Sequence, residues 1–240
     1  MVISENINMK IIDFHSHILP GIDDGSRNLE MSQAMLAAEK QQGAEVVCLT
    51  PHFYAEQMYL ETFLANREAS WEKIREDAQK LSLTCILGCE CAFYPGIGSS
   101  DAVEKLLFEG SRVLLLEMPF RPWTEEEINE VEKLIRRGIQ VVIAHLERFL
   151  KLQKDKRMIG ALTELPVTIQ INAHSLEPVL AGRKLCAGFK EGKYHLIGSD
   201  AHSLERRPVN IGTGREMLRK RCGEDVLRAV DEAGNDLLGL

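Results

Sequence analysis

Seven short apolar runs alternate with longer polar stretches along the chain, and this rhythm constrains its fold more than any other feature. Each run is four or five residues long and mostly apolar on both faces, as in parallel strands that are covered on both sides. Strands that alternate with helices indicate βα units, so seven runs predict a closed or nearly closed (β/α) barrel. A doubly wound open sheet is the alternative. The runs occupy residues 11–14, 46–50, 84–88, 113–116, 141–144, 167–171 and 194–197.

The stretches between the runs carry the signals of amphipathic helices. Residues 31–38 place apolar side chains at helical spacing. Thr124, with Glu127 three residues later, forms a capping box that opens another helix, and we expect this helix to end at Gly138. The charged segment 60–81 predicts one long outer helix.

The composition is that of an ordinary globular domain. Of the 240 residues, 45% are hydrophobic and 27% are charged, which predicts a single domain with a full core. We expect residues 1–9 to be a flexible lead and residues 10–240 to be the domain. No apolar run approaches the roughly 18 residues of a membrane-spanning helix, so direct membrane insertion is not expected. The formal net charge of −7 argues against non-specific binding to nucleic acid, which needs a broad basic surface.

The cysteines indicate a reducing environment. Six cysteines are too few for a disulfide scaffold, and residues 1–10 lack the pattern of a secretory signal, so a cytoplasmic location with reduced thiols is expected. Cys222 and Arg228 have the C-x5-R spacing of cysteine-dependent tyrosine phosphatases. Glu224 and Asp225 lie between them and would repel a phosphate dianion, so we interpret this match as chance.

Polar residues follow every apolar run, at the point where each predicted strand ends. The carboxyl ends of parallel strands meet at one face, which is where such folds place their chemistry. Five of the seven histidines lie at these ends, and scattered surface residues would not align in this way. The residues are His15, His17, His52, Glu90, Glu117, His145, Asn172, Asp200 and His202, and Asp24 follows the first run in an Asp-Asp-Gly turn. All except Asn172 are good metal ligands, so the pattern predicts a metal site.

Ligand chemistry limits the metal. His15 and His17, two residues apart at a strand end, can chelate one ion. Five imidazoles and four carboxylates exceed the coordination of a single ion, which implies two or three ions. Nitrogen and oxygen ligands without thiolate suit Mn, Fe or Zn better than Ca or Mg. Three divalent ions outweigh four carboxylates in charge, and the surplus would attract an anion such as a phosphoryl group.

Arginines follow two of these strand ends. Arg148 lies three residues after His145, and Arg206 and Arg207 closely follow His202. Because guanidinium groups bind phosphate oxygens bidentately, we expect Arg148 and Arg207 to bind a phosphoryl group. Arg206 is the weaker candidate.

Other side chains near these ends have structural interpretations. Phe120 and Trp123, in the loop after the fourth run, either pack on a phenyl ring at the mouth of the site or anchor the loop. His195 lies within the last run and is interpreted as a core histidine. Cys89 and Cys91 are interpreted as small buried residues and not as ligands.

Six motifs stand out along the chain. They are IIDFHSHILPGIDDGS at 11–26, TPH at 50–52, GCE at 88–90, IAHLERF at 143–149, QINAHS at 170–175 and GSDAHSLERRP at 198–208. Together they resemble the PHP (polymerase and histidinol phosphatase) family, and more closely its branch of bacterial manganese-dependent protein-tyrosine phosphatases. The resemblance runs from about residue 10 to the C-terminus and implies a distorted (β/α)7 barrel with a trinuclear site. The family's metal ligands match His15, His17, Asp24, His52, Glu90, Glu117, His145, Asp200 and His202, and its phosphate-binding arginines match Arg148 and Arg207.

The resemblance also implies a reaction and a partner. It implies a phosphoric monoester hydrolase that acts on phosphotyrosine in a bacterial tyrosine autokinase of capsular or exopolysaccharide synthesis. The expected chemistry is in-line attack on phosphorus by a hydroxide activated by manganese, with Arg148 and Arg207 stabilising the phosphoryl oxygens. His202 and a metal-bound water are the candidate acids. A small-molecule phosphatase of the histidinol-phosphatase type is the alternative, and a non-catalytic metal-binding partner module is a further one.

Overall fold

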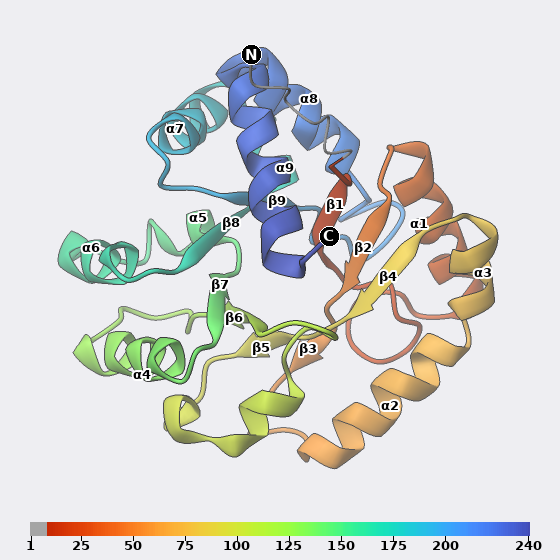
Figure 1. Ribbon diagram of the computed structural model, residues 1–240, viewed down its shortest axis with the longest axis horizontal. Coiled ribbons are helices and arrows are strands. Elements are labelled where there is room, and N and C mark those ends of the chain that lie inside the picture. Colours follow the sequence, from red (N-terminus) through yellow and green to blue (C-terminus); the bar gives the residue numbers. More distant parts are fainter. Residues whose placement is uncertain (1–8) are drawn as a thin grey trace, which may run out of the picture.

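The computed structural model describes residues 9–240, so residues 1–8 of the expected flexible lead lie outside the described residues. Each apolar run overlaps a strand, and every strand pairing within the described residues is parallel (Figure 1). The strands are β1 (Ile12–Ser16), β2 (Val46–Leu49), β3 (His52–Phe53), β4 (Thr84–Leu87), β5 (Glu90–Ala92), β6 (Val113–Glu117), β7 (Gln140–Ile143), β8 (Thr168–Asn172) and β9 (Leu196–Gly198).

The strands form one curled sheet in two hydrogen-bonded parts. One part has the order β1-β2-β4 and the other the order β3-β5-β6-β7-β8-β9. The chain passes from β2 to β3 and from β4 to β5 after only two residues, so these two pairs continue from one part into the other. The first and last strands also meet, because Ser16 and Ala201 form a parallel bridge and Asp200 N–H donates to His15 C=O at 2.7 Å. The carboxyl ends of β1 and β9 therefore lie side by side.

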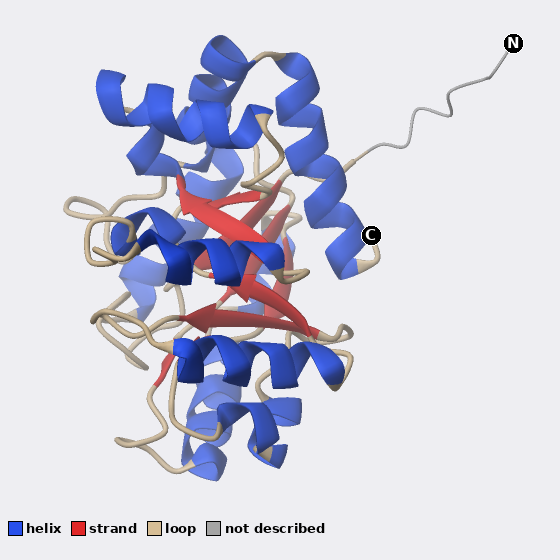
Figure 2. Cartoon of the chain, turned by 90° about the vertical axis from the view of Figure 1, so that its left-hand side faces the viewer, coloured by secondary structure: helices blue, strands red, loops and turns tan. Residues whose placement is uncertain are grey.

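Helices lie along the outside of the sheet (Figures 1 and 2). The predicted capping box is confirmed, because the Thr124 hydroxyl accepts from Glu126 N–H while the Glu127 carboxylate accepts from Thr124 N–H. The α-helices are α1 (Leu29–Gln41), α2 (Leu60–Glu72), α3 (Arg75–Lys80), α4 (Glu125–Arg136), α5 (Leu146–Phe149), α6 (Lys156–Glu164), α7 (Val179–Lys190), α8 (Ile211–Cys222) and α9 (Glu224–Leu238). Short 3-10 helices occupy η1 (Ile97–Ser99), η2 (Asp101–Lys105) and η3 (Ala173–Leu176).

The single long helix predicted for residues 60–81 is wrong. The segment forms α2 and α3, which are separated at Lys73 and Ile74. Ile74 leaves helical geometry, with φ −118° and ψ −3°, and its side chain is fully buried. Burying this side chain redirects the chain, and the local sequence does not signal the change because its charged pattern continues across the break.

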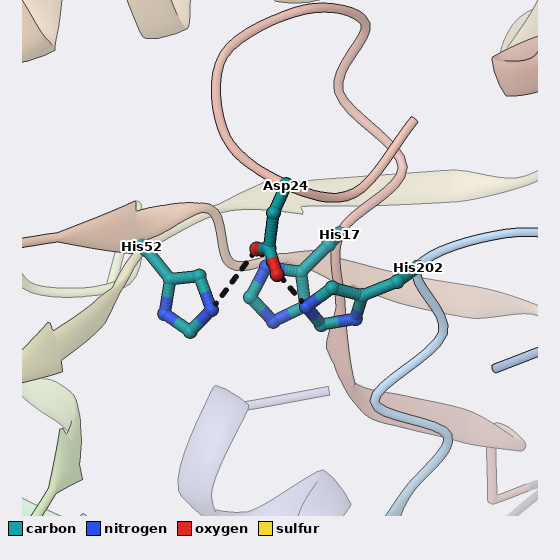
Figure 3. A group of neighbouring side chains, drawn as sticks. All are labelled: His17, Asp24, His52 and His202. Carbon is teal, nitrogen blue, oxygen red and sulfur yellow. Dashed lines mark ion pairs between the residues drawn. The ribbon is translucent and has the colours of Figure 1, made fainter. Parts of the chain in front are cut away.

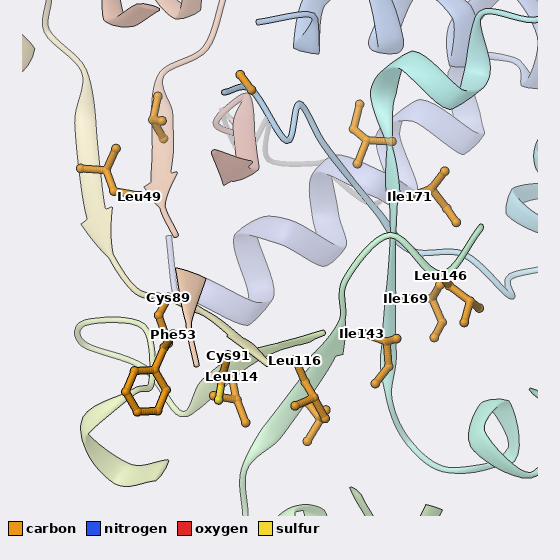
Figure 4. Close-up of a cluster of buried hydrophobic side chains, with 14 of the residues drawn as sticks. Leu49, Phe53, Cys89, Cys91, Leu114, Leu116, Ile143, Leu146, Ile169 and Ile171 are labelled. Carbon is orange, nitrogen blue, oxygen red and sulfur yellow. The ribbon is translucent and has the colours of Figure 1, made fainter. Parts of the chain in front are cut away.

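Two layers of apolar side chains hold the sheet in place. The larger cluster lies between the strands and the outer helices and includes Leu49, Leu116 and Ile143 (Figure 4). The smaller cluster includes Phe14 and Leu196, which pack with helix α9. Each fully buried side chain of this size contributes about 1.5–3 kcal/mol. Since α9 packs on β1 and β9 near their starts, it leaves the carboxyl ends of the strands free for polar groups.

The cysteines differ in part from what the sequence predicts. Cys186 in α7 and Cys222 in α8 form a disulfide, with their Cα atoms 5.7 Å apart, so the expectation of reduced thiols is wrong for this pair. The two helices pack side by side, and this proximity was not readable from the sequence. Cys89 and Cys91 are free and buried, as expected.

None of the helices formed by residues 9–240 combines the length and the apolar character needed to cross a membrane.

Candidate metal centre

The structure gathers the nine predicted ligand side chains in one place at the carboxyl edge of the sheet. They fall into four overlapping groups, and within each group the atoms that could bind an ion lie within 4.8 Å of one another. The groups are His17, Asp24, His52 and His202 (Figure 3); His15, Glu90 and His145; His15, His17 and Asp200; and His52, Glu90 and Glu117. Because His15, His17, His52 and Glu90 each belong to two groups, the four groups form one continuous cluster.

Glu90, at the start of β5, is the centre of this cluster. Its Oε1 lies 2.6 Å from His145 Nε2, and its Oε2 lies 2.9 Å from His52 Nδ1 and 3.3 Å from His15 Nε2. The side chain is only 1% exposed. Burial alone raises the pKa of a carboxyl, but the adjacent His15 and His145 hold the pKa of Glu90 well below its usual range. Glu90 is therefore a carboxylate, with one oxygen directed to each side of the cluster.

Glu117, at the end of β6, is a second carboxyl in the same small space. Its Oε1 lies 3.4 Å from His145 Nε2. Burial and the charge of Glu90 raise the pKa of Glu117 to about 8. Two carboxylates that share a buried site repel each other, and a cation between them would offset this repulsion.

Several buried atoms of the cluster have electron pairs but no hydrogen bond. Among residues 9–240, these atoms include Glu90 Oε2, Asp200 Oδ1 and His202 Nε2. In addition, His15 Nε2 and His17 Nε2 face each other at 3.0 Å. An unsatisfied buried acceptor costs about 1–3 kcal/mol, so this concentration of free acceptors needs an explanation. Divalent cations fit this donor set, because imidazole nitrogens and carboxylate oxygens are their usual ligands.

The histidine rings are held in place by a second layer of polar groups. Asp23 Oδ2 lies 2.7 Å from His17 Nδ1 and accepts from His52 N–H at 3.0 Å. Gln170 Oε1 lies 3.2 Å from His15 Nδ1 and accepts from His145 N–H at 2.8 Å. These contacts occupy the Nδ1 atoms of His15 and His17, so that Nε2 is the atom presented to the cluster.

Sequence reasoning missed Asp23 and Gln170 as site residues. The sequence indicates only a turn at Asp23. In the structure, burial raises the pKa of Asp23, but the contact with His17 outweighs burial and lowers this pKa to about 2. Gln170 lies within a strand, and only its place in the motif QINAHS drew attention to it. Asn172, expected at a strand end, does reach the site, because its Nδ2 donates to Asp200 Oδ2 at 2.7 Å.

The backbone at the site is strained at two positions. His145 and Asp200 have φ values of 30° and 53°, in the left-handed region that residues other than glycine rarely adopt. Each such residue costs about 1–3 kcal/mol, and the surrounding structure has to supply this energy. Both turns direct a side chain into the cluster, since each residue lies two positions after the end of a strand and its side chain is buried.

Asp24 closes the cluster from the solvent side. It lies in the loop after β1, and its side chain is 70% exposed. Its Oδ1 is 3.4 Å from both His52 Nε2 and His202 Nε2, and Figure 3 shows the carboxylate between these two rings. Asp24 is therefore close enough to these two rings to share an ion with them, and its role as a ligand stays a prediction.

Arg148 and Arg207 both reach the cluster through one carboxylate. An Nη atom of Arg207 donates to Asp200 Oδ2 at 2.5 Å, and an Nη atom of Arg148 lies 3.6 Å from the same oxygen. Their side chains are 36% and 40% exposed, so both guanidinium groups lie at the mouth. Arg206 is exposed and makes no ion pair within residues 9–240. The ion pair with Asp200 therefore distinguishes Arg207 from Arg206, and phosphate binding by Arg207 stays a prediction.

The aromatic residues near the mouth have different roles. Phe120 is 52% exposed, and the Arg148 guanidinium lies 5.1 Å from the centre of its ring. Trp123 is buried and donates from Nε1 to Pro119 C=O, so it anchors the loop. His195 accepts from Ile169 N–H, but it is only half-buried and lies just before β9, so its interpretation as a core histidine within the strand is wrong. Cys222 lies in the disulfide on α8 and has no part in this cluster.

The curled parallel sheet and the histidine–carboxylate cluster at its carboxyl edge define an α/β protein with a candidate metal centre at its strand ends. A model of the family described as capsular polysaccharide synthesis, CpsB/CapC, matches residues 11–235, so the chain belongs to this family. This agrees with the resemblance found in the sequence.

Two similar proteins and one solved structure carry related names. The tyrosine-protein phosphatase CpsB of Streptococcus pneumoniae is 26% identical over 224 residues, which cover 89% of this chain and 91% of that protein. The tyrosine-protein phosphatase YwqE of Bacillus subtilis (strain 168) is 28% identical over 237 residues, covering 95% and 91%. A crystal structure from a study of YwqE and CpsB, described as metal-dependent tyrosine phosphatases, superposes with a TM-score of 0.81 at 24% identity, covering 95% of this chain and 94% of the other. At this identity the superposition shows a shared fold.

Proposed function

We propose that this chain is a metal-dependent protein-tyrosine phosphatase, which hydrolyses phosphotyrosine on a bacterial tyrosine autokinase of capsular or exopolysaccharide synthesis. One observation carries the proposal: two arginines contact Asp200 at the edge of a cluster of nine ligand-type side chains. This arrangement places positive charge for a phosphoryl group directly beside a site for cations. The names of the relatives and the family description support the same reaction and setting.

The proposed metal ligands are the nine residues of the cluster, and they would hold two or three divalent ions, with Mn²⁺ favoured over Fe²⁺ or Zn²⁺. Glu90 is proposed to bridge ions, because its two oxygens face different histidines. The absence of thiolate from the four groups and the mixture of nitrogen and oxygen atoms support this choice of metals. Bound ions would supply positive charge for the phosphoryl oxygens and lower the pKa of a water molecule.

The side chains around the cluster have distinct tasks in this proposal. Arg148 and Arg207 orient the phosphoryl group and stabilise charge on its oxygens as it is transferred. Burial and the neighbouring His17 lower the pKa of His202 to about 4, so its ring is neutral at pH 7. Because a neutral imidazole can bind a metal ion, we favour His202 as a metal ligand over His202 as the general acid. Phe120, exposed beside Arg148, offers an apolar surface to the phenyl ring of phosphotyrosine.

The proposed architecture is a distorted (β/α)7 barrel of the PHP type that forms a single domain from residue 10 to residue 240. Its support is the continuity of β2 with β3 and of β4 with β5, which reduces the strand segments to the seven runs of the sequence. The bridge between Ser16 and Ala201, which brings β1 beside β9, is further support. A cytoplasmic location remains a prediction from the sequence.

The test combines metal removal with a choice of substrates. Protein treated with EDTA should lose turnover of a phosphotyrosine peptide, and Mn²⁺ should restore it, while Cys222→Ser should keep most of the activity. Full activity in metal-free protein would exclude the proposed chemistry. Histidinol phosphate serves as the competing substrate, and a higher kcat/KM for it than for the phosphopeptide would favour a small-molecule phosphatase instead.

A further inference from the structure

A groove with a volume of about 850 Å³ opens directly from the metal centre. One wall consists of residues from the loop after β1 and the first turn of α1, between positions 24 and 31. The other wall is the loop of residues 202–207, which follows β9. No residue of the Phe120 loop lines the groove, so the groove leaves the centre on the side of Arg207 and not on the side of Phe120.

The groove and the metal centre share three residues. Asp24 and His202 belong to the cluster, Arg207 contacts Asp200, and all three also line the groove. A substrate whose phosphoryl group lies at the cluster therefore has the groove immediately beside it. Its volume is in the range of sites that hold drug-sized molecules, about 300–1,000 Å³. This is more space than a phosphoryl group requires, so the groove has room for further parts of a substrate.

The lining of the groove favours an extended polypeptide over a second small anion. Arg27 and Glu30 lie on one wall, and Leu204, Glu205, Arg206 and Arg207 lie on the other, so charges of both signs line the groove. An anion site needs converging cations, whereas here two glutamates lie among the arginines and would repel a free anion. Leu204 is 47% exposed, which gives the groove an apolar contact between charged groups. Alternating charged and apolar contacts suit the backbone and mixed side chains of a peptide.

We infer that this groove binds the polypeptide segment on one side of the phosphotyrosine, so that the enzyme recognises residues beyond the phosphorylated side chain. The inference rests on the proposed phosphatase function. It assigns Arg27 and Leu204, from opposite walls, to binding of the substrate chain. Neither residue touches the metal cluster, so both act on the choice of substrate and not on the chemistry.

The experiment compares substrates of different length with the Mn²⁺-loaded protein. The substrates are free phosphotyrosine, a long phosphopeptide, and two shorter peptides that keep residues on only one side of the phosphotyrosine. The readout is the ratio of kcat/KM for each peptide to kcat/KM for free phosphotyrosine, so that any effect on the chemistry cancels. For the wild type, we expect a ratio above one for the long peptide and for only one of the two shorter peptides.

The double variant Arg27→Ala/Leu204→Ala should lower the ratio for the long peptide about 3- to 10-fold, as expected for two partly exposed contacts. The matched control is Arg183→Ala/Leu180→Ala, which removes the same two residue types from exposed positions on α7, outside the groove. An unchanged ratio in the groove variant, or an equal fall in the control, would overturn the inference while leaving the phosphatase proposal intact. If the wild type hydrolyses neither phosphotyrosine nor the peptides, the phosphatase proposal itself fails, and the role of the groove fails with it.

Discussion

Replacing Arg207 by alanine tests whether phosphate binding can be separated from metal binding. A guanidinium cannot bind a cation, so Arg207→Ala should leave the metal content unchanged. Asp200 loses one partner but keeps the Asn172 Nδ2 donor at 2.7 Å, which holds its carboxylate in position. The variant should therefore fold and bind metal, and its defect should appear in turnover.

The size of this defect follows from the exposure of the side chain. A hydrogen bond between charged groups is worth about 1.5–3 kcal/mol when well shielded, equivalent to about 10- to 150-fold in kcat/KM. Because the Arg207 side chain is 36% exposed, solvent weakens the interaction, and we expect the lower part of this range, about 10- to 30-fold. Arg207→Lys should recover only part of the loss, since lysine keeps the charge but not the planar fork.

The assay is hydrolysis of para-nitrophenyl phosphate by Mn²⁺-loaded protein, with metal content measured on the same samples. Arg206→Ala is the matched control, because the neighbouring guanidinium is exposed and has no ion pair within the described residues. A silent Arg207→Ala together with a strongly impaired Arg206→Ala would refute the assignment, because the last motif would then be read one residue out of register.

Three further predictions concern metal binding and stability. Glu90→Ala should reduce the metal content by at least one ion and nearly abolish turnover, because Glu90 lies beside four histidines of the cluster; normal stoichiometry by elemental analysis would argue against a bridge. The pKa of about 8 for Glu117 means that the carboxyl holds a proton at pH 7, and the ligand is the deprotonated form. Metal affinity should therefore rise as pH increases towards 8, with proton release on binding that calorimetry in buffers of different ionisation enthalpy can detect. Glu117→Gln should reduce this release but not abolish it, because the pKa values of His15 and His17 are also raised. Thr124→Ala removes the capping hydroxyl of α4 and should lower the free energy of unfolding by about 1 kcal/mol, measured by urea denaturation; no change would mean that Glu127 satisfies the helix end alone.

The strands and the convergence of polar side chains at their carboxyl ends were predictable from the sequence for the same reason. Parallel strands that are buried on both faces appear as short apolar runs, and their carboxyl ends must meet at one edge. Polar residues directly after the runs, such as His15, Glu117 and His145, were therefore expected to converge, and they do. The capping box at Thr124 was predictable because its two partners lie within one helical turn.

The features that the sequence did not reveal depend on contacts between distant segments. Ile74 interrupts the expected long helix because its side chain is buried against the core, and nothing in its neighbours signals this. Gln170 orients His15 across a sequence separation of 155 residues. Cys186 and Cys222 meet only because α7 packs on α8. None of these contacts follows from local periodicity or spacing.

The junction between the first and last strands has a consequence for how the chain acquires its site during synthesis. Ser199 N–H donates to the Asp13 carboxylate at 2.8 Å across a separation of 186 residues, next to His15 and Asp200. A growing chain that has not yet reached this segment lacks Asp200, His202 and Arg207, so it cannot complete the cluster. Pairing over such a distance is among the slowest steps of folding, because the entropy of a long loop is lost before its contacts form. The ability to bind the full set of metal ions should therefore appear abruptly, late in folding, and a chain truncated before β9 should acquire none of it.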